Sequence, residues 1–455
     1  MSDDTRVLSW LKGLPERVEY IPLPSHEPCK KRNAATASRY RLASPPASLN
    51  DEENKIASTP KKRRLEGPSA LLDPDATPRP GAGARIRSVA SSSASISQSP
   101  SETSSVSGAS SPKKQMMSLR LSETGVEWLA LNENTVPEVA RTLFNTMGEV
   151  GRGHDILPDV SRPAITEKLK ARNMDLRRWK YCFKPADEGD ALPGRIPSIE
   201  EVEKVLMKAT ECENFKHEEA SWNSQVHLRL LEGIFEEPLG GQCDDFNAVS
   251  CTSARPHREF KPISSTSKMI DICVYASLDR DEELRVAMTE FSNITPTMAV
   301  NHTDFETIQH RPLLLSIETK KPGVEWEKAQ LQTGVWHAAQ WAFLRWGVGQ
   351  KLLRKRLEQG LDAPTTDEEQ EEFKGEKLAA LSKLDFIPGV IVQGNGWHFV
   401  LSTYEYGKTK LWTDWVFGTT KGLLDIYSVI AGIRELTAWL EILTCPGLGC
   451  IFWIE

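Results

Sequence analysis

The sequence lacks a long apolar run, a paired-cysteine motif and a signal segment. No stretch approaches the roughly 20 apolar residues that a membrane-spanning helix needs, and no apolar signal region follows the charged N-terminus. The eight cysteines include no CxxC pair and no regular spacing, which favours reduced thiols in an intracellular compartment. We therefore expect a soluble, unsecreted protein.

Large apolar side chains are scarce in residues 1 to 115, which are rich in Ser, Pro and Ala. This segment has 18 Lys and Arg against 12 Asp and Glu, a net charge of +6, whereas the remainder has 38 against 51, a net charge of −13. The whole chain, 455 residues long, exceeds what one hydrophobic core normally organises. We predict a disordered basic arm over 1–115, a helical lead-in over 116–200 and a folded domain over 201–445.

The basic arm contains two short clusters of positive charge. One is Lys61, Lys62, Arg63 and Arg64, and the other spans residues 30–32. Such clusters are read by nuclear import receptors or by nucleic acid, although a solvated charge run is the simpler alternative. We expect a nuclear protein, otherwise a cytoplasmic one. Residues 7–18 have helical apolar spacing and predict a short, transient amphipathic helix.

Apolar periodicity downstream predicts an α/β domain. Helices are expected around 139–144 and 165–174, followed by two helices over 200–235 that divide near 212–216. Ser198 and Glu201 are spaced as a capping box for the first of these two. We expect strands over 268–276, 312–320, 386–394 and 396–404, helices over 326–349 and 423–441, and a charged, partly helical surface insertion over 351–384.

The strand at 313–321 carries most of the functional information. Side chains alternate along a strand, so Glu318 and Lys320 share one face while Ile317 and Thr319 share the other. We expect the charged pair to lie at a sheet edge or cleft, where paired charges cost less than in the interior. A simple ion pair between the two is the alternative interpretation.

Three groups have the chemistry of a magnesium site. Mg²⁺ prefers hard oxygen ligands and keeps several waters, so Asp271, Glu318 and the carbonyl of Thr319 form a sufficient ligand set. Lys320 could then orient or acidify the attacking water beside a phosphate. The alternative for Asp271 is a salt bridge with Lys268 or a solvated strand end.

Two helical residues are candidates for supporting roles. Glu219 begins an otherwise apolar helical stripe and could hold metal through water, or could be an ordinary acidic residue at a helix start. Gln332 could contact a ligand water or the scissile phosphate, or be an exposed helical residue. We predict that His227 is packed or hydrogen bonded, and that Trp341, Phe343 and Trp346 belong to the core.

The order helix Glu, strand Asp, strand Glu-x-Lys, helix Gln resembles the PD-(D/E)XK nuclease superfamily, and in detail its fungal nuclease-like domain family. The resembling pieces run from about 120 to 440 and are Glu219-Ala-Ser-Trp222-Asn223-x-x-Val226-His227, Lys268-Met-Ile-Asp271, Ser316-Ile-Glu318-Thr-Lys320, Gln332-Thr-Gly334-Val-Trp336, Gly394-Asn-Gly-Trp397 and Gly418-Thr-Thr.

This resemblance implies a restriction-endonuclease-like core, with a mixed sheet between helices. It also implies Mg²⁺ (or Mn²⁺) on Asp271 and Glu318, Lys320 at the water, Glu219 and Gln332 in support, and nucleic acid as the substrate. Beyond the resemblance, we expect DNA rather than RNA. The separation of Asp271 and Glu318 implies an inserted loop or extra elements over 277–311.

Three functions remain open at this stage. The first is a metal-dependent nuclease. The second is a non-catalytic nuclease-like module that binds nucleic acid or protein, which the acidic body favours. The third is an interaction protein whose basic arm does the work.

Overall fold

The computed structural model describes residues 111–444 apart from 188, 244, 263–268, 324 and 383, with the backbone alone over 441–444. The predictions for the basic clusters, for the helix at 7–18, for Lys268 and for the chain beyond 444 therefore lie outside the described residues. The first described helix begins at Pro112, a few residues before the predicted end of the arm.

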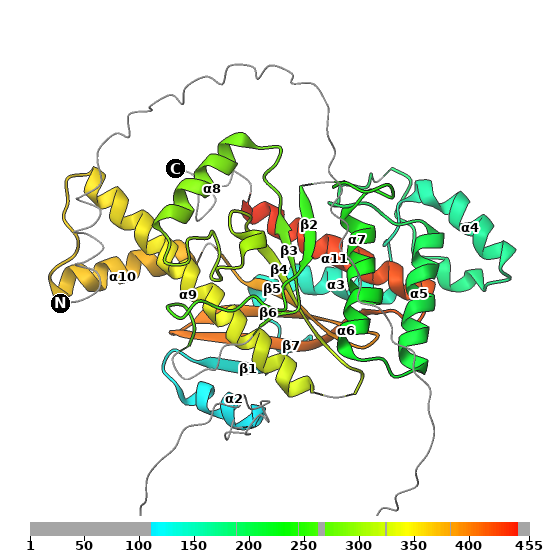
Figure 1. Cartoon of the computed structure of the whole chain (residues 1–455), viewed down its shortest axis with the longest axis horizontal. Coiled ribbons are helices and arrows are strands. Elements are labelled where there is room, and N and C mark those ends of the chain that lie inside the picture. Colours follow the sequence, from blue (N-terminus) through cyan, green and yellow to red (C-terminus); the bar gives the residue numbers. More distant parts are fainter. Residues whose placement is uncertain are drawn as a thin grey trace, which may run out of the picture. The chain divides into compact units, whose positions relative to one another are not determined.

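A seven-stranded mixed sheet forms the centre of the domain (Figure 1). Its spatial order is β1-β7-β6-β5-β4-β3-β2. The pairs β1/β7 and β4/β5 are parallel and the other four pairs are antiparallel. The strands are β1 (Val126–Ala130), β2 (Phe246–Ser250), β3 (Ile272–Ala276), β4 (Leu313–Lys320), β5 (Ile387–Gln393), β6 (Gly396–Glu405) and β7 (Lys408–Thr419). The predicted α/β class and mixed sheet are confirmed.

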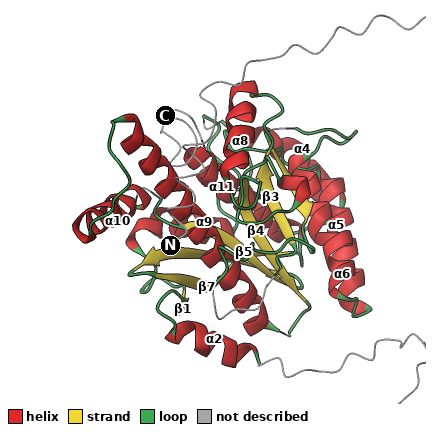
Figure 2. Ribbon diagram, turned by 60° about the vertical axis from the view of Figure 1, so that its left-hand side comes forward, coloured by secondary structure: helices red, strands yellow, loops and turns green. Residues whose placement is uncertain are grey.

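Helices cover both faces of this sheet (Figure 2). On one face α9 packs through Ala329 against Ile391 and Val400 of β5 and β6. On the other face α3 and α11 share the main apolar core with the central strands. The helices are α2 (Pro112–Leu121), α3 (Arg141–Arg152), α4 (Arg162–Ala171), α5 (Ile199–Asn214), α6 (Glu219–Trp222), α7 (Leu228–Phe235), α8 (Glu282–Ile294), α9 (Trp326–Glu358), α10 (Asp367–Leu381) and α11 (Leu423–Thr444).

The close approach of α9 to the sheet depends on one small residue. A Cβ atom at Gly389 of β5 would lie 2.8 Å from Nε2 of His337 on α9, closer than such atoms come in folded proteins. His337 is fully buried there and bonds Ser316 of β4 and Ser402 of β6 through its two ring nitrogens. A side chain at 389 would push α9 away from the strands that carry the candidate site.

Several local predictions can be compared with this fold. Ser198 caps α5 in a capping box with Glu201, as its spacing predicts. Residues 277–311 contain the extra helix α8, and the excursion over 351–384 holds the end of α9 and the helix α10. The segment 116–200 is not only helical, because it also supplies edge strand β1.

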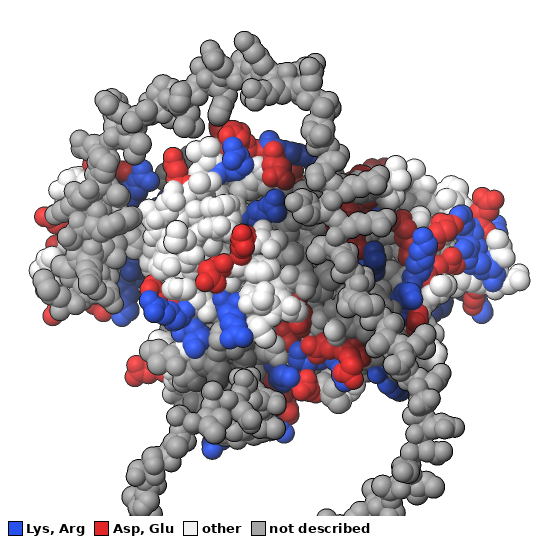
Figure 3. Space-filling view, viewed as in Figure 1, with Lys and Arg blue, Asp and Glu red and all other residues white. Residues whose placement is uncertain are grey.

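Charged side chains of both signs are mixed over the surface in Figure 3, where Lys and Arg lie beside Asp and Glu. Many of these form short-range ion pairs along helices, such as Arg141 with Glu138 and Arg285 with Glu282. Such exposed pairs are worth at most about 1 kcal/mol each. Among the described helices, none has the length and apolar character required to cross a membrane.

Candidate active site

Four of the five predicted catalytic residues meet at the end of β4. The Nζ atom of Lys320 lies 2.5 Å from Oε1 of Glu318 and 2.6 Å from the carbonyl oxygen of Thr319. The same atom is 3.5 Å from Oε2 of Glu219 and 4.0 Å from Oδ2 of Asp271. Residues separated by 101 positions in the chain, Glu219 and Lys320, are therefore neighbours across one ammonium group.

Of the two predicted locations for the charged pair, a sheet edge or a cleft, the sheet edge is wrong. Strand β4 lies between β5 and β3, and all eight of its residues are buried. Glu318 is 0% exposed and Lys320 is 3% exposed. Burial of this pair is tolerated because the ammonium bonds the carboxylate directly and has two further carboxylates nearby.

Asp271 is fixed by hydrogen bonds immediately before β3. Its Oδ2 atom accepts from the backbone N–H of Thr319 at 2.8 Å and from the Thr319 hydroxyl at 3.0 Å. Thr319 was predicted to contribute only its carbonyl oxygen. The structure adds a second role for this residue, because it also holds Asp271 against the end of β4.

The charges in this cluster do not balance. Burial, with the negative charge of Asp271, raises the pKa of Glu318 well above its usual value despite the nearby ammonium. Burial likewise raises the pKa of Glu219. Burial alone would lower the pKa of Lys320, but the carboxylates outweigh it and raise that pKa, so Lys320 stays positive. Three carboxylates thus surround one cation.

Gln332 contacts the segment just before Asp271. Its Nε2 atom donates to the carbonyl of Met269 at 3.1 Å, two residues before Asp271. Its Oε1 atom is buried and has no hydrogen-bond partner among the described residues. Gln332 therefore supports the segment that carries Asp271, and the alternative of an ordinary exposed glutamine is wrong.

The remaining candidates behave as packing residues. His227 is fully buried, and burial lowers its pKa to about 4, so the ring is neutral. Trp341 and Phe343 are buried, as predicted, whereas Trp346 is only partly buried and packs against the cluster of Phe343. Lys321, the residue after Lys320, is partly exposed and pairs with Glu218.

Two cysteines beside the site were not found from the sequence. Cys251 and Cys273 are fully buried, and their sulfur atoms lie 2.8 Å apart. The backbone N–H of Cys251 also donates to the carbonyl of Asp271 at 2.9 Å. Their proximity depends on the pairing of β2 with β3, and β2 had no clear apolar pattern. None of the five described cysteines forms a disulfide.

The oxygen atoms of the cluster fit a divalent cation. Within the described ranges, no group of three or more His, Cys, Asp or Glu side chains is placed to hold a metal ion. Mg²⁺, however, also takes backbone carbonyls and water, so two carboxylates and one carbonyl suffice. The supporting observation is Oε2 of Glu318, which is buried without a hydrogen-bond partner in this part of the chain. Asp271, Glu318 and the Thr319 carbonyl would hold the ion.

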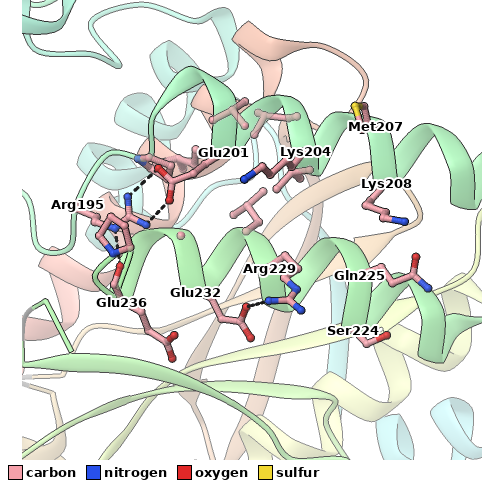
Figure 4. Close-up of a pocket in the computed structure, with 18 of the residues that line it drawn as sticks. Arg195, Glu201, Lys204, Met207, Lys208, Ser224, Gln225, Arg229, Glu232 and Glu236 are labelled. Carbon is pink, nitrogen blue, oxygen red and sulfur yellow. Dashed lines mark hydrogen bonds and ion pairs between the residues drawn. The ribbon is translucent and has the colours of Figure 1, made fainter. Parts of the chain in front are cut away.

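A cavity lies elsewhere, lined by α5, the turn Asn223–His227, α7 and α11 (Figure 4). It has a volume of about 820 Å³, and none of the predicted catalytic residues lines it. Figure 4 shows Arg195 turned toward Glu201 and Arg229 toward Glu232, and these contacts measure 2.6 Å and 3.1 Å. Its cations are thus largely neutralised by neighbouring glutamates.

Taken together, the mixed sheet between helices and the Asp, Glu-x-Lys cluster at the end of β4 define a nuclease-like α/β domain. A family model described as the PD-(D/E)XK nuclease superfamily matches residues 164–442, which is more than half of the chain. The chain therefore belongs to the PD-(D/E)XK nuclease superfamily. No curated protein and no solved structure matches it significantly. The fungal subfamily stays a prediction.

Proposed function

We propose that this chain hydrolyses phosphodiester bonds of nucleic acid in a reaction that depends on Mg²⁺ or Mn²⁺. The observation that carries this proposal is the excess of negative charge around Lys320, where three carboxylates meet and Oε2 of Glu318 is buried without a partner among the described residues. A divalent cation would supply the missing positive charge.

Each residue of the cluster then has a role that follows from its position. Asp271, Glu318 and the Thr319 carbonyl are the ligands, and the Thr319 N–H and hydroxyl fix the orientation of Asp271. A bound metal would lower the pKa of a water molecule and neutralise charge on the phosphate. Lys320, which stays positive, orients that water or a phosphate oxygen. Glu219 adds a carboxylate, and Gln332 supports the Asp271 segment.

The direct test is cleavage of labelled DNA and RNA oligonucleotides by purified protein, with Mg²⁺ or Mn²⁺ and with a chelator. Wild type should cut in metal and not in chelator, and Glu318→Ala should be inactive. Lys321→Met is the matched control, because this neighbouring lysine is partly exposed and pairs with Glu218, which has no role in the proposed site. Identical, metal-independent cleavage by wild type and Glu318→Ala would exclude the proposed chemistry.

A second candidate function is a non-catalytic module that binds nucleic acid or protein. The observation that favours it is the contact of Lys320 with Glu318 and with the Thr319 carbonyl, since the ammonium already bonds two of the oxygens that a metal needs. Calorimetry separates the two functions. A catalytic site should bind Mn²⁺ in wild type and lose this binding in Asp271→Asn, whereas a non-catalytic module should show no such binding.

We further propose DNA rather than RNA as the substrate, and import into the nucleus through Lys61, Lys62, Arg63 and Arg64. The support for import is the sequence of the basic arm alone. A reporter protein fused to residues 1–115 should accumulate in the nucleus, and the same fusion with these four residues changed to alanine should not. Competition between DNA and RNA oligonucleotides in the cleavage assay tests the substrate.

A further inference from the structure

Three of the sequence pieces quoted above converge behind the candidate site. They are the segment from Glu219 to His227, the turn from Gly394 to Trp397 and the Gly418-Thr-Thr segment. The residues of the first segment after Glu219, and all residues of the other two segments, have no role in the proposed chemistry. Their contacts connect the elements that carry Glu219 and Lys320.

The connection begins at a π-turn. Residues Asn223–His227 form one turn of π-helix directly after α6, the short helix that begins at Glu219. Single π-turns occur often at functional sites, because the extra residue redirects the side chains that follow. Here the last residue of the turn is His227, whose ring lies between those of Trp222 and Trp397 at centroid distances of 5.9 Å and 5.6 Å.

The ring of His227 has a defined hydrogen-bond pattern. Nε2 lies 3.2 Å from the carbonyl oxygen of Gly394, which can only accept, so Nε2 carries the proton. Nδ1 lies 3.1 Å from the atom placed as Oδ1 of Asn223, and the oxygen and nitrogen of a side-chain amide can be exchanged by turning the amide over. A neutral ring has only one N–H, so we assign the amide orientation in which Asn223 donates to Nδ1. His227 thus links the π-turn to the β5–β6 turn.

Gly394 continues the link to β4. Its backbone N–H donates to the carbonyl of Lys320 at 2.9 Å, so Gly394 contacts β4 through its N–H and His227 through its carbonyl. Gly394 has φ +58°, and a Cβ atom there would lie 2.5 Å from Pro322, just beyond the end of β4. This position therefore requires glycine.

Asn395 secures the same turn from the other side. Its side-chain amide donates to Glu213 at the end of α5 at 2.9 Å, and its Oδ1 accepts from the Thr420 hydroxyl at 2.6 Å. The backbone N–H of Thr420 also donates to the carbonyl of Asn395 at 3.0 Å. His227, Gly394 and Asn395 form a junction that joins the ends of α5, the π-turn, β4 and the segment after β7.

We propose that His227 is a positioning residue that sets the distance between Glu219 and Lys320 through this junction. Glu219 and Lys320 come from two of the elements that it joins, and they have only a 3.5 Å side-chain contact between them. Without the His227 bond to Gly394, the start of α6 is still linked to the end of β4 by the side-chain ion pairs of Lys320 with Glu219 and of Lys321 with Glu218, but it loses a buried bond to the backbone of the β5–β6 turn. This inference rests on the proposed function, because it assigns Glu219 a role in the metal site.

The test uses two changes at this position and one matched control. His227→Phe keeps the ring volume and loses both hydrogen bonds, whereas His227→Gln can still donate to Gly394. His302→Phe is the control, because His302 is equally buried and packs on Trp336 outside the junction. Asn223→Ala is a milder second variant that removes only the partner of Nδ1 and serves if His227→Phe does not fold.

Mn²⁺ calorimetry and hydrogen exchange measured by mass spectrometry give independent results. Loss of a residue behind metal ligands typically costs about 10–100-fold in metal affinity or activity, so His227→Phe should bind Mn²⁺ at least tenfold more weakly and His227→Gln should recover most of the affinity. In metal-free protein, His227→Phe should speed exchange in the peptides that contain Glu219 and Lys320, and His302→Phe should not.

The two measurements distinguish the failure of this inference from failure of the proposed function. If wild type binds no metal, the proposed function fails, and the exchange data alone decide the role of His227. Unchanged exchange in both peptides of folded His227→Phe, or of Asn223→Ala in its place, overturns the inference. Equal loss of Mn²⁺ affinity in His227→Phe and His302→Phe also overturns it, because a general loss of stability would then explain the effect.

Discussion

Replacement of Lys320 by methionine should destabilise the metal-free protein in a strongly pH-dependent way. The side chain keeps its length and loses its charge, while Glu318, Glu219 and Asp271 remain around the position of Nζ. An ionised carboxylate about 4 Å from an ammonium gains about 4 kcal/mol at an effective dielectric constant of 20. All three carboxylates lie within 4.0 Å of Nζ, so they cannot all stay ionised once the ammonium is gone.

The folded variant should respond by holding at least one proton more than the wild type holds. Removal of one partner from a buried ion pair costs about 3–5 kcal/mol. When the pKa of a carboxyl group is higher in the folded state than in the unfolded state, the protein loses stability as pH rises above the unfolded pKa. That pKa is 4.5 for Glu318. One extra bound proton changes the free energy of unfolding by about 1.4 kcal/mol per pH unit, so the penalty should grow by about 3 kcal/mol between about pH 5.5 and pH 8.

Denaturant unfolding in the presence of a chelator measures this penalty at both pH values. Lys321→Met provides the control, since its exposed pair with Glu218 should contribute no more than about 1 kcal/mol at either pH. A loss of stability in Lys320→Met that is the same at both pH values would refute the reasoning, because it would mean that the three carboxylates do not depend on this ammonium.

Three further predictions concern the same cluster and one helix start. Glu318→Gln should abolish cleavage and raise the stability of the metal-free protein at about pH 8 by about 1 kcal/mol or more. Glutamine is neutral without a bound proton, whereas burial and Asp271 raise the pKa of Glu318, and Glu219 and Asp271 still face Lys320 in the variant. A loss of stability in denaturant unfolding would contradict this. Metal binding should release protons and strengthen with rising pH by up to about tenfold per pH unit, since burial raises the pKa of Glu318 and Glu219. Calorimetry in two buffers of different ionisation enthalpy measures the released protons. An affinity that does not change with pH would count against the ligand set. Ser198→Ala should lower the free energy of unfolding by about 1 kcal/mol through loss of the α5 cap and leave the cleavage rate unchanged. If denaturant unfolding gives the same free energy for the variant and the wild type, the cap contributes nothing.

The parts of the fold that follow from the sequence are those with a clear local pattern. Strand β4 is a continuous apolar run that ends in Glu-Thr-Lys, and its predicted and observed bounds differ by one residue. The capping box at Ser198 likewise needs only four residues to be recognised. The strands β1, β2 and β7 went unpredicted because each mixes polar and apolar residues. Of these, β1 and β2 lie at the two edges of the sheet.

In the site too, the arrangement of residues close in sequence was predictable and the contacts between distant segments were not. The sequence places Glu318 and Lys320 on one face, and the structure agrees. The depth of the pair was not predictable, because it depends on α9 and on the flanking strands β3 and β5, whose residues pair with β4 from as far as 45 and 73 positions away. The roles of Thr319 as a donor and of Gln332 as a bond to Met269 are also products of tertiary packing.

Helix α9 is 33 residues long and so extends for about 50 Å. Gln332 and His337, near its start, touch the site and the sheet, while its far half runs out to α10 and the loop between them (Figure 1). That loop, residues 359–366, is a suitable place to attach a fluorophore or an affinity tag. A label there would report substrate binding by a change in tumbling without touching the carboxylates.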